Sequence, residues 1–271
     1  MNNINVSMQA ELASLDFIQP DFRLVSITGG AVNNSYRLET SDKNYFVKTF
    51  ESANVVLLDR KRLFDFQLKL VDKGLAVNPI YLSKSRDFQI DEWLDTPTLD
   101  KADVSELVTI KRLAASLSLI HNTEISAQEL DLPAQWQHYI SLIDSPISTS
   151  DQQTIDNYTT IWQNACSTKA VFCHNDLSSS HITNAQPSKV LDWEYCALSC
   201  PYFDLASCVA VNDFGIADEA SLYAFYAQYS GQRLSDVIAK STRMKPLVEL
   251  TNRLWFQAAN RSNTIATDLA T

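Results

Sequence analysis

The feature that most constrains this chain is a change in its hydrophobic period. Residues 22–50 contain short apolar-rich runs, FRLVSI, SYRLE and YFVKTF, separated by glycines and a polar turn, which is typical of β-strands. Beyond about residue 95, apolar side chains recur mainly at helical spacing. The 271 residues suffice for two folding units. We therefore predict an α+β protein with a β-rich N-terminal lobe, residues 1–94, and a mainly helical C-terminal lobe, residues 95–271.

The predicted helices have recognisable ends. Apolar residues between Leu63 and Leu70 follow a helical period, and Gly74 is a C-terminal stop signal. Asp103, with Glu106 three residues later, fits a capping box. The sequence therefore predicts helices over residues 56–73, 103–121, 151–166 and 216–230, and a hairpin over residues 81–95.

The composition excludes several classes of protein. A hydrophobic content of 45% and an aromatic content of 10% are too high for an intrinsically disordered chain. No run of about 18 uncharged apolar residues occurs, so we predict no membrane insertion. The N-terminus has no basic or apolar signal region, which predicts a cytoplasmic location. The net charge of -10 disfavours nucleic acid and favours a cationic small molecule, although it also serves solubility. The oligomeric state stays open.

The five cysteines form no disulfide framework that the sequence reveals. Their odd number and the lack of a secretory signal favour reduced thiols. Cys196 and Cys200 form a C-x3-C pair and Cys173 precedes His174, but no second close pair completes a four-ligand zinc site. We therefore expect thiols at all of these positions: Cys166, Cys173, Cys196, Cys200 and Cys208.

Two aspartates carry the strongest chemical signal. Asp176 follows the apolar run VFCH, and Asp192 ends the run KVLDW. If these runs are paired strands, both carboxylates lie at the same end of the pair. One aspartate would then orient and deprotonate a hydroxyl while the other holds magnesium on the phosphates of ATP. The alternative is that each aspartate only caps a turn.

The segments around these aspartates resemble a known superfamily. HNDL, then LDWEY, then PYFDLAS are similar to motifs of the choline kinase, thiamine kinase and aminoglycoside phosphotransferase superfamily, which is related to protein kinases. Upstream, GGAVNNSYRL resembles its phosphate loop and YFVKTF its lysine-bearing strand. The likeness covers roughly residues 24–210 and is nearest to bacterial choline or thiamine kinases. It implies a two-lobed, protein-kinase-like fold.

The resemblance also implies roles for individual residues. Asp176 would be the catalytic base, Asp192 would bind magnesium, and His174 and Asp204 would support the catalytic loop. The residues expected to bind ATP are Lys48, Gly30, Asn33, Asn34, and Glu92 and Leu94 through their backbone. Lys48 shares a strand face with Phe46, which is unusual for lysine. Its alternative is an exposed strand lysine, and the glycine pair could be an ordinary turn.

Three positions depart from the superfamily pattern. His181 replaces an asparagine that would bind the metal, and imidazole suits manganese better than magnesium. Leu63 replaces the glutamate that would pair with the lysine, and Asp65 is expected to face elsewhere on the helix. Cys200 replaces an aspartate. The resemblance therefore implies ATP and Mg²⁺ as cofactors, with Mn²⁺ as an alternative and His181 as a second metal ligand.

The resemblance implies a small alcohol as the phosphate acceptor. Choline, ethanolamine and thiamine are cationic alcohols that aromatic faces and carboxylates can hold. The acceptor-binding residues expected are Trp193, Glu194, Tyr195 and Trp255. Two other functions stay open: a non-catalytic descendant of the fold that binds a nucleotide or a partner, and an aminoglycoside phosphotransferase. A protein kinase is disfavoured, since DWE stands where protein kinases have DFG and no A-P-E follows.

Overall fold

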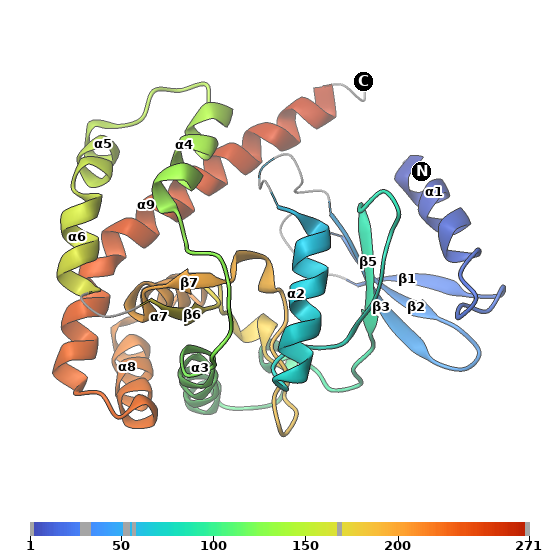
Figure 1. Ribbon diagram of the computed structural model, residues 1–271, viewed down its shortest axis with the longest axis horizontal. Helices are drawn as coiled ribbons and strands as arrows, with labels where there is room; N and C mark the ends of the chain where they lie inside the picture. The colour runs from blue at the N-terminus through green and yellow to red at the C-terminus, as the bar shows by residue number, and fades with distance from the viewer. Residues whose placement is uncertain (1–2, 28–33, 51–54, 56–57, 167–169, 269–271) are drawn as a thin grey trace. The chain divides into compact units, whose positions relative to one another are not determined.

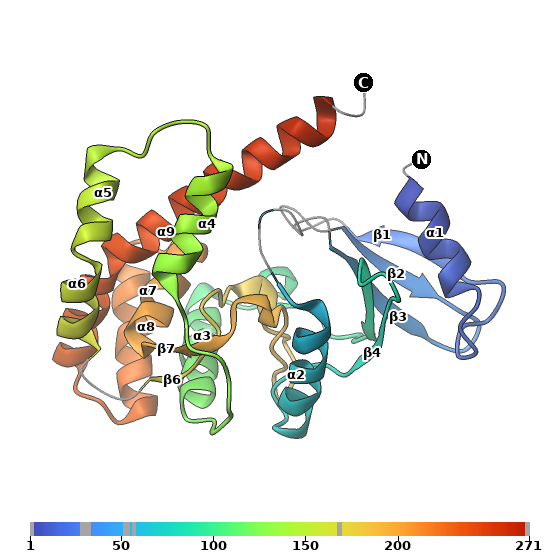
Figure 2. The same ribbon diagram turned by 45° about the horizontal axis from the view of Figure 1, so that its top comes forward.

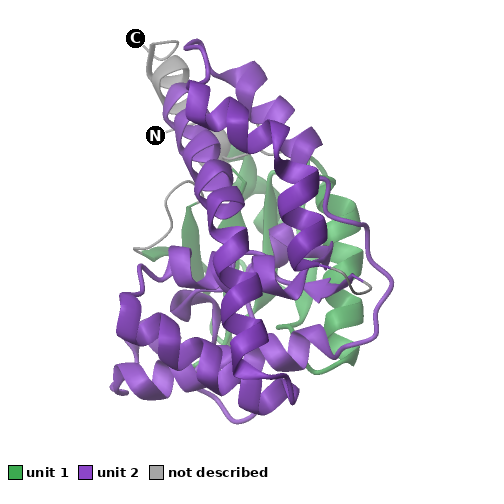
Figure 3. Ribbon diagram, turned by 90° about the vertical axis from the view of Figure 1, so that its left-hand side faces the viewer, with its two compact units in different colours: residues 1–95 green, residues 96–271 purple. Residues whose placement is uncertain are grey.

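The computed structural model describes residues 3–27, 34–50, 55, 58–166 and 170–268. It contains two compact units, Met1–Asp95 and Thr96–Thr271 (Figure 3, green and purple). The first is built on an antiparallel sheet and the second is mostly helical, which confirms the predicted α+β class. The predicted phosphate-loop residues Gly30 and Asn33 lie outside the described residues.

The first unit contains a five-stranded antiparallel sheet with strand order β1-β2-β3-β5-β4 (Figure 1). Its strands are β1 (Arg23–Ile27), β2 (Ser35–Glu39), β3 (Asn44–Thr49), β4 (Pro79–Leu82) and β5 (Phe88–Glu92). The strands predicted within residues 22–50 are confirmed. So is the predicted hairpin, although its first strand begins earlier, at Pro79.

The two faces of this sheet differ in burial. Alternate side chains of β3 are fully buried, namely Tyr45, Val47 and Thr49. Lys48 and Phe46 share the opposite, half-buried face, as predicted. α1 (Asn3–Leu12) lies along the buried face (Figure 1), where Met8 and Leu12 join the apolar core of the unit. The sequence does not predict α1, because its apolar residues recur at every second position, which is not a helical period: Ile4, Val6, Met8, Ala10 and Leu12.

α2 (Arg60–Asp72) contacts the half-buried face, since Gln89 of β5 donates to the carboxamide oxygen of Gln67 at 2.9 Å. The helix is capped by Asp59, whose carboxylate accepts the amide of Arg62 at 3.2 Å. It ends before Gly74, whose φ of +75° is the left-handed conformation that favours glycine. The predicted stop at Gly74 is therefore confirmed. The helix begins at Arg60 rather than at the predicted residue 56, because residues 58 and 59 are not helical and Asp59 is the N-cap; residues 56 and 57 lie outside the described residues.

The second unit is a helical assembly with a two-stranded ribbon (Figure 2). Its helices are α3 (Glu106–His121), α4 (Leu132–Leu142), α5 (Thr149–Asp156), α6 (Tyr158–Ala165), α7 (Pro201–Val211), α8 (Ile216–Ser230) and α9 (Leu234–Asp268). The ribbon pairs β6 (Val171–Cys173) with β7 (Ala197–Ser199). α3 packs on α8, and α9 runs along α4, α6 and α7. No helix in the described residues is long and apolar enough to cross a membrane.

The structure corrects two predicted helices and confirms a third. α3 begins at Glu106 with Ser105 as its N-cap, so the capping box predicted from Asp103 does not form. The helix predicted over 151–166 is two helices, α5 and α6, because the chain turns at Asn157. α8 matches the predicted range 216–230.

The predicted pairing of VFCH with KVLDW is wrong. Strand β6 pairs with Ala197–Ser199, and Val190 of the second run forms only an isolated bridge to Ile182. Both runs are apolar and short, so the sequence could not distinguish which of two nearby segments hydrogen-bonds to the first. The two aspartates are therefore brought together by other contacts.

Replacing Leu12 by alanine should destabilise the first unit. Leu12 is fully buried in the core of that unit, and emptying such a site costs about 2–5 kcal/mol of unfolding free energy. Val6, on the same helix, is 64% exposed, so Val6→Ala is the matched control. The check is the urea midpoint of each variant, and equal midpoints would contradict the assigned packing of α1.

Candidate active site

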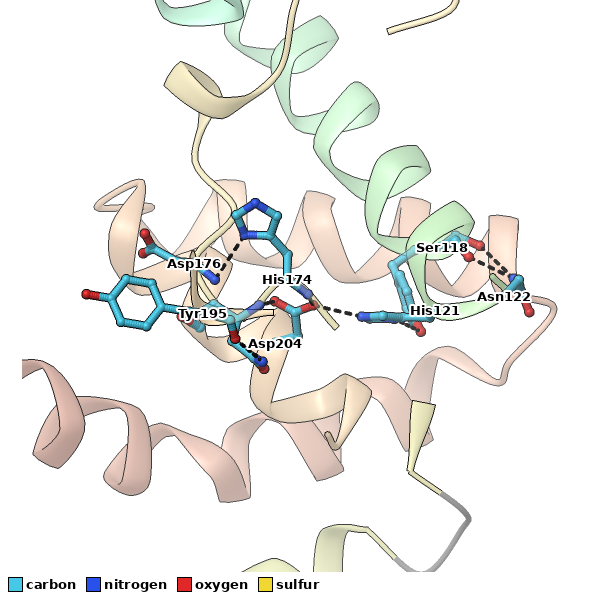
Figure 4. Close-up of polar contacts among 10 residues, drawn as sticks. Ser118, His121, Asn122, His174, Asp176, Tyr195 and Asp204 are labelled. Atoms are coloured by element: carbon cyan, nitrogen blue, oxygen red, sulfur yellow. Dashed lines mark hydrogen bonds and ion pairs between the residues drawn. The ribbon is translucent and has the colours of Figure 1, made fainter. Parts of the chain in front are cut away.

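The candidate catalytic loop follows β6 and is held by one buried carboxylate (Figure 4). Asp204, in the first turn of α7, accepts the amide of His174 at Oδ2 and that of Asn175 at Oδ1, both at 2.8 Å. Asn175 has a φ of +65°, a left-handed conformation that is rare for non-glycine residues. Its carbonyl accepts the hydroxyl of Ser207 at 2.7 Å, and its side-chain amide donates to the carbonyl of Tyr195 at 2.9 Å. These contacts keep the loop in its strained shape.

Asp204 also contacts a histidine from a distant helix. His121, the last residue of α3, places Nε2 3.0 Å from Oδ2 of Asp204, and its Nδ1 lies 2.8 Å from the hydroxyl of Tyr226 on α8. Burial opposes ionisation of Asp204, but its hydrogen bond with His121 and the loop amides hold its pKa below the ordinary value. The carboxylate is therefore ionised and satisfied in the interior. His174 and Asp204, which the resemblance assigns to the support of the catalytic loop, both hydrogen-bond to backbone amides of that loop.

Cys173 lies beside this carboxylate. Ligand atoms of His121, Cys173 and Asp204 lie within 4.8 Å of one another. Burial raises the pKa of Cys173 well above its ordinary value, so the sulfur stays protonated. The histidine and the carboxylate already hydrogen-bond within the protein, so this cluster is suited to structure rather than to metal binding.

Two histidines connect the Asp176 segment to the Asp192 segment. His174 accepts the amide of Asp176 at Nδ1 (3.3 Å) and donates from Nε2 to the carbonyl of Leu191 (2.9 Å). Burial, with the charge of His181 second, lowers the pKa of His174 to about 4, so the ring is neutral at pH 7. The amide of Leu191 in turn donates to the carbonyl of His181 at 2.8 Å. These bonds place the aspartates together without the strand pairing that the sequence predicts.

His181 directs one ring nitrogen toward Asp192. Its Nδ1 lies 2.8 Å from the carbonyl oxygen of Asp176, which only accepts, so Nδ1 carries the proton. Nε2, the other ring nitrogen, lies 3.8 Å from Oδ2 of Asp192 and can bind a cation when the ring is neutral. Asp192 itself has a φ of +60°. A carboxylate oxygen and an imidazole lone pair at this separation fit a shared divalent cation, and the bond to the Asp176 carbonyl is the outer contact typical of metal-binding histidines.

The surroundings of Asp176 make the ionised form of its carboxyl group less stable than it is in water. Burial is the largest cause, and although His181 opposes it, the charges of Asp192, Glu194 and Asp204 add to the effect. Together they raise the pKa of Asp176 to about 7. A carboxyl group with such a pKa can accept a proton near neutral pH.

Two tyrosines from different elements, Tyr195 and Tyr139, lie near the carboxyl group of Asp176. The ring of Tyr195 extends beside the carboxyl group of Asp176, away from His121 (Figure 4). Burial raises the pKa of Tyr139 on α4, and the charges of Glu194 and Asp176 raise it further, which locates its hydroxyl near both acids. Nothing in the sequence selects Tyr139, since only tertiary packing of α4 brings it to this loop.

The other two predicted acceptor aromatics have different surroundings. Trp193 is buried, stacks on Phe172 with ring centroids 5.7 Å apart, and donates from its indole to the carbonyl of Val190. These contacts make Trp193 a packing residue beneath the loop. Trp255 lies on α9 against Phe256, and its buried indole N–H has no hydrogen-bond partner among the described residues.

Those predicted ATP-binding residues of the first unit that the structure describes lie on or beside its sheet. Lys48 is opposite Ser35 and Gln89 in the neighbouring strands. The carbonyl of Asn34 accepts the amide of Thr49 at 2.9 Å.

Glu92 and Leu94, which are also predicted to bind ATP, lie at the end of β5. Asp65, near the departure from the superfamily pattern at Leu63, lies on α2. Glu92 donates its amide to the carbonyl of Asn78 at 2.9 Å, and Leu94 is half-buried beyond the strand end. Asp65 of α2 is exposed and pairs with Lys61, in agreement with the prediction that it faces away from Lys48.

An antiparallel N-terminal sheet, followed by a helical unit that carries an aspartate-bearing loop, is the arrangement of kinase-like phosphotransferases. A model of the phosphotransferase enzyme family matches residues 23–247, and the chain belongs to that family. Protein LicA of Haemophilus influenzae is 23% identical over 85% of this chain and 71% of its own length. These findings confirm the family resemblance seen in the sequence.

Two solved structures share the fold. Choline kinase LicA from Streptococcus pneumoniae has a TM-score of 0.73 at 21% identity, with 99% of each chain covered. Plasmodium vivax ethanolamine kinase has a TM-score of 0.74 at 15% identity, covering 100% of this chain and 89% of its own. The chain therefore has the choline kinase-like form of the two-lobed protein kinase fold.

Replacing Asp176 by asparagine should stabilise the metal-free protein in a pH-dependent way. The folded-state pKa of about 7 exceeds the ordinary value of 3.8, so ionisation costs folding free energy as pH rises between these values. Each unit of pKa difference corresponds to about 1.4 kcal/mol. The gain in Tm of Asp176→Asn over the parent should grow from pH 4 to pH 7 and then stay level.

The measurement is thermal unfolding in a chelator across this pH range. Asp103 is exposed, so Asp103→Asn is the control that removes one charge without the burial. A constant difference between Asp176→Asn and the parent at every pH would contradict the raised pKa of Asp176.

Proposed function

We propose that this protein transfers the γ-phosphate of ATP to the hydroxyl group of a small cationic alcohol. The observation that carries the proposal is the half-buried Asp176 carboxyl group, which lies beside Asp192 and His181 on the loop that Asp204 and His174 hold. The chain's membership of the phosphotransferase enzyme family supports phosphoryl transfer as the class of reaction.

In this proposal Asp176 is the general base. Its carboxylate takes the proton of the acceptor hydroxyl as that oxygen attacks the γ-phosphorus atom. A pKa of about 7 leaves a useful fraction of Asp176 ionised at neutral pH while keeping it basic enough to accept the proton. His174 stays neutral and keeps the loop in position.

Asp192 and His181 are the proposed ligands of a divalent cation. The carboxylate oxygen and the unprotonated Nε2 converge at 3.8 Å, and they supply one hard and one softer donor. When bound, magnesium or manganese would neutralise charge on the phosphate oxygens. The imidazole favours manganese relative to an asparagine at the same position.

The first unit is the proposed site of nucleotide binding. Lys48 would pair with the α- and β-phosphates, and the segment with Gly30, Asn33 and Asn34 would cover them. The amide of Glu92 is already bonded to Asn78, so the backbone of Leu94 is the better candidate for an adenine contact. These roles come from the family resemblance.

A cationic acceptor is favoured by the charges around Asp176. Glu194 and Asp192 add negative charge, while the half-buried Tyr195 offers aromatic surface near the same carboxyl group. Structural neighbours described as choline kinase and ethanolamine kinase act on alcohols of this kind. We therefore rank choline and ethanolamine first, then thiamine, with aminoglycosides last.

A second candidate is a non-catalytic protein that keeps the nucleotide-binding fold. It is favoured by Asp65, which pairs with Lys61 on the exposed face of α2, and by Leu63 at the position where the family has the lysine's glutamate partner. Nucleotide-dependent stabilisation without ADP release would identify this function.

Acceptor-dependent ADP release from ATP should occur with at least one cationic alcohol. The panel holds choline, ethanolamine, thiamine and an aminoglycoside, each with magnesium and with manganese. Asp176→Asn should lower turnover by ~10²–10⁴-fold because the general base is lost, and Asp192→Ala should lower it at least as much. Near-parental turnover of Asp192→Ala would refute the metal assignment.

Replacing His181 by asparagine should shift metal preference toward magnesium. The carbonyl oxygen of asparagine is a harder donor than Nε2 of His181. The check is the ratio of turnover with magnesium to turnover with manganese, which should rise in the variant. Identical ratios in the parent and in His181→Asn would show that His181 does not bind the metal.

A further inference from the structure

Asn212 connects the loop that carries Asp176 to the end of α7. It is the C-cap residue of that helix and is half-buried. Its side-chain oxygen Oδ1 accepts the amide of Ser179 at 2.8 Å, and its Nδ2 donates to the carbonyl of Leu177 at 3.1 Å. One side chain therefore holds the backbone on both sides of Ser178, directly after Asp176 in the chain.

A further contact fixes the orientation of this side chain. Nδ2 also donates to the carbonyl of Cys208, four residues earlier in α7, at 2.7 Å. A carboxamide offers two N–H donors and one oxygen. One hydrogen of Asn212 is therefore directed to the helix, while the other hydrogen and the oxygen are directed to the loop. Aspartate at this position would keep the acceptor and lose both donors, and alanine would lose all three groups.

Asn157 shows what the end of a helix requires by itself. It is the C-cap of α5 with φ -90° and ψ 0°, nearly the values of Asn212, which are -95° and 1°. It also donates from its side chain to the carbonyl four residues earlier, that of Gln153, at 2.8 Å. Asn157 is exposed, whereas Asn212 contacts the loop. Helix capping therefore explains the contact of Asn212 with α7 and does not explain its contacts with the loop.

The same helix holds the loop at two places, one on each side of Asp176. Asp204, in the first turn of α7, accepts the amides of His174 and Asn175, which precede Asp176. Asn212, at the opposite end of the helix, contacts the backbone that follows Asp176. The base proposed above thus lies between two attachments to one rigid element.

The segment that Asn212 holds leads to His181. The amide of His181 donates to the carbonyl of Ser178 at 3.0 Å, and its Nδ1 donates to the carbonyl of Asp176 at 2.8 Å. The backbone from Asp176 to His181 therefore closes on itself through the segment that Asn212 contacts. A rotation of the peptide planes in this segment would move the Asp176 carbonyl away from the ring.

We propose that Asn212 is a positioning residue of the candidate active site. It keeps the ring of His181 on the carbonyl of Asp176, with the proton on Nδ1 and with Nε2 directed at Asp192. The catalytic consequence rests on the proposed phosphoryl transfer. The position of the ring does not, and it can be measured in metal-free protein without a substrate.

The test is nitrogen NMR of the histidine rings, because the chemical shifts show which ring nitrogen carries the proton. The chain has four histidines to label, and about pH 8 lies above the ordinary pKa of imidazole. The parent should show His181 protonated on Nδ1 and His174 on Nε2, the nitrogen that donates to the carbonyl of Leu191. Asn212→Ala should give His181 a mixture of both tautomers and leave His174 unchanged.

Two further variants separate positioning from general stability. Asn157→Ala removes the same bond to a helix carbonyl, so His181 should keep its parental tautomer even if Tm falls. Asn212→Asp keeps the acceptor for Ser179 and loses both donors, so it should show the mixed tautomers of Asn212→Ala. A parental His181 signal in either Asn212 variant would overturn the proposal. So would protonation of His181 on Nε2 in the parent, a result that depends on no variant's folding.

Turnover tests the catalytic consequence separately. With an acceptor that supports ADP release, Asn212→Ala should lower kcat by ~10²-fold, the effect expected when a catalytic group is displaced by about 1 Å. KM for ATP should stay at the parental value, and Asn157→Ala should change neither constant. A parental kcat in Asn212→Ala would overturn the catalytic role of this residue. If the parent turns over no acceptor, the proposed function fails, and the ring signals alone decide whether Asn212 positions His181.

Discussion

The buried carboxylate of Asp204 is the interaction on which the helical unit depends. It joins the first turn of α7 to the amides of His174 and Asn175 and to His121 at the end of α3. Through Tyr226, the same network reaches α8. An ionised group in the interior is tolerated only when it is fully hydrogen-bonded. Because several elements supply those bonds, the loop is positioned by the packing of the whole unit.

Asp204 and Asp176 show opposite responses to burial. Asp204 accepts enough hydrogen bonds to hold its pKa down, whereas burial, followed by the charges of three other acidic groups, raises the pKa of Asp176 to about 7. Asn175 and Asp192, the two residues of the site with strained backbone, both lie between β6 and β7. Strain and raised pKa values are concentrated at functional sites, since the surrounding structure must compensate for both. This contrast supports the proposed base and its supporting residue.

Much of the site could be predicted from the sequence, but its physical basis could not. HNDL and LDWEY identified Asp176 and Asp192 as a pair, yet the strand pairing expected to join them is absent. His174, His181 and Leu191 hydrogen-bond across the gap instead. The ring nitrogen of a histidine that carries the proton cannot be read from the sequence, because it depends on which groups face each nitrogen. Only the structure shows that Nε2 of His181 is directed at Asp192.

By itself, the sequence determined the β-rich first part, the strands of residues 22–50, the helix α8 and the family motifs. These depend on short-range period, turn residues and local motifs, which are properties of adjacent residues. Tertiary structure decided that the buried Tyr139 packs near the acidic site and that Trp193 is buried beneath the candidate catalytic loop. Such contacts join segments far apart in the chain, and their partners are chosen by how the helices pack.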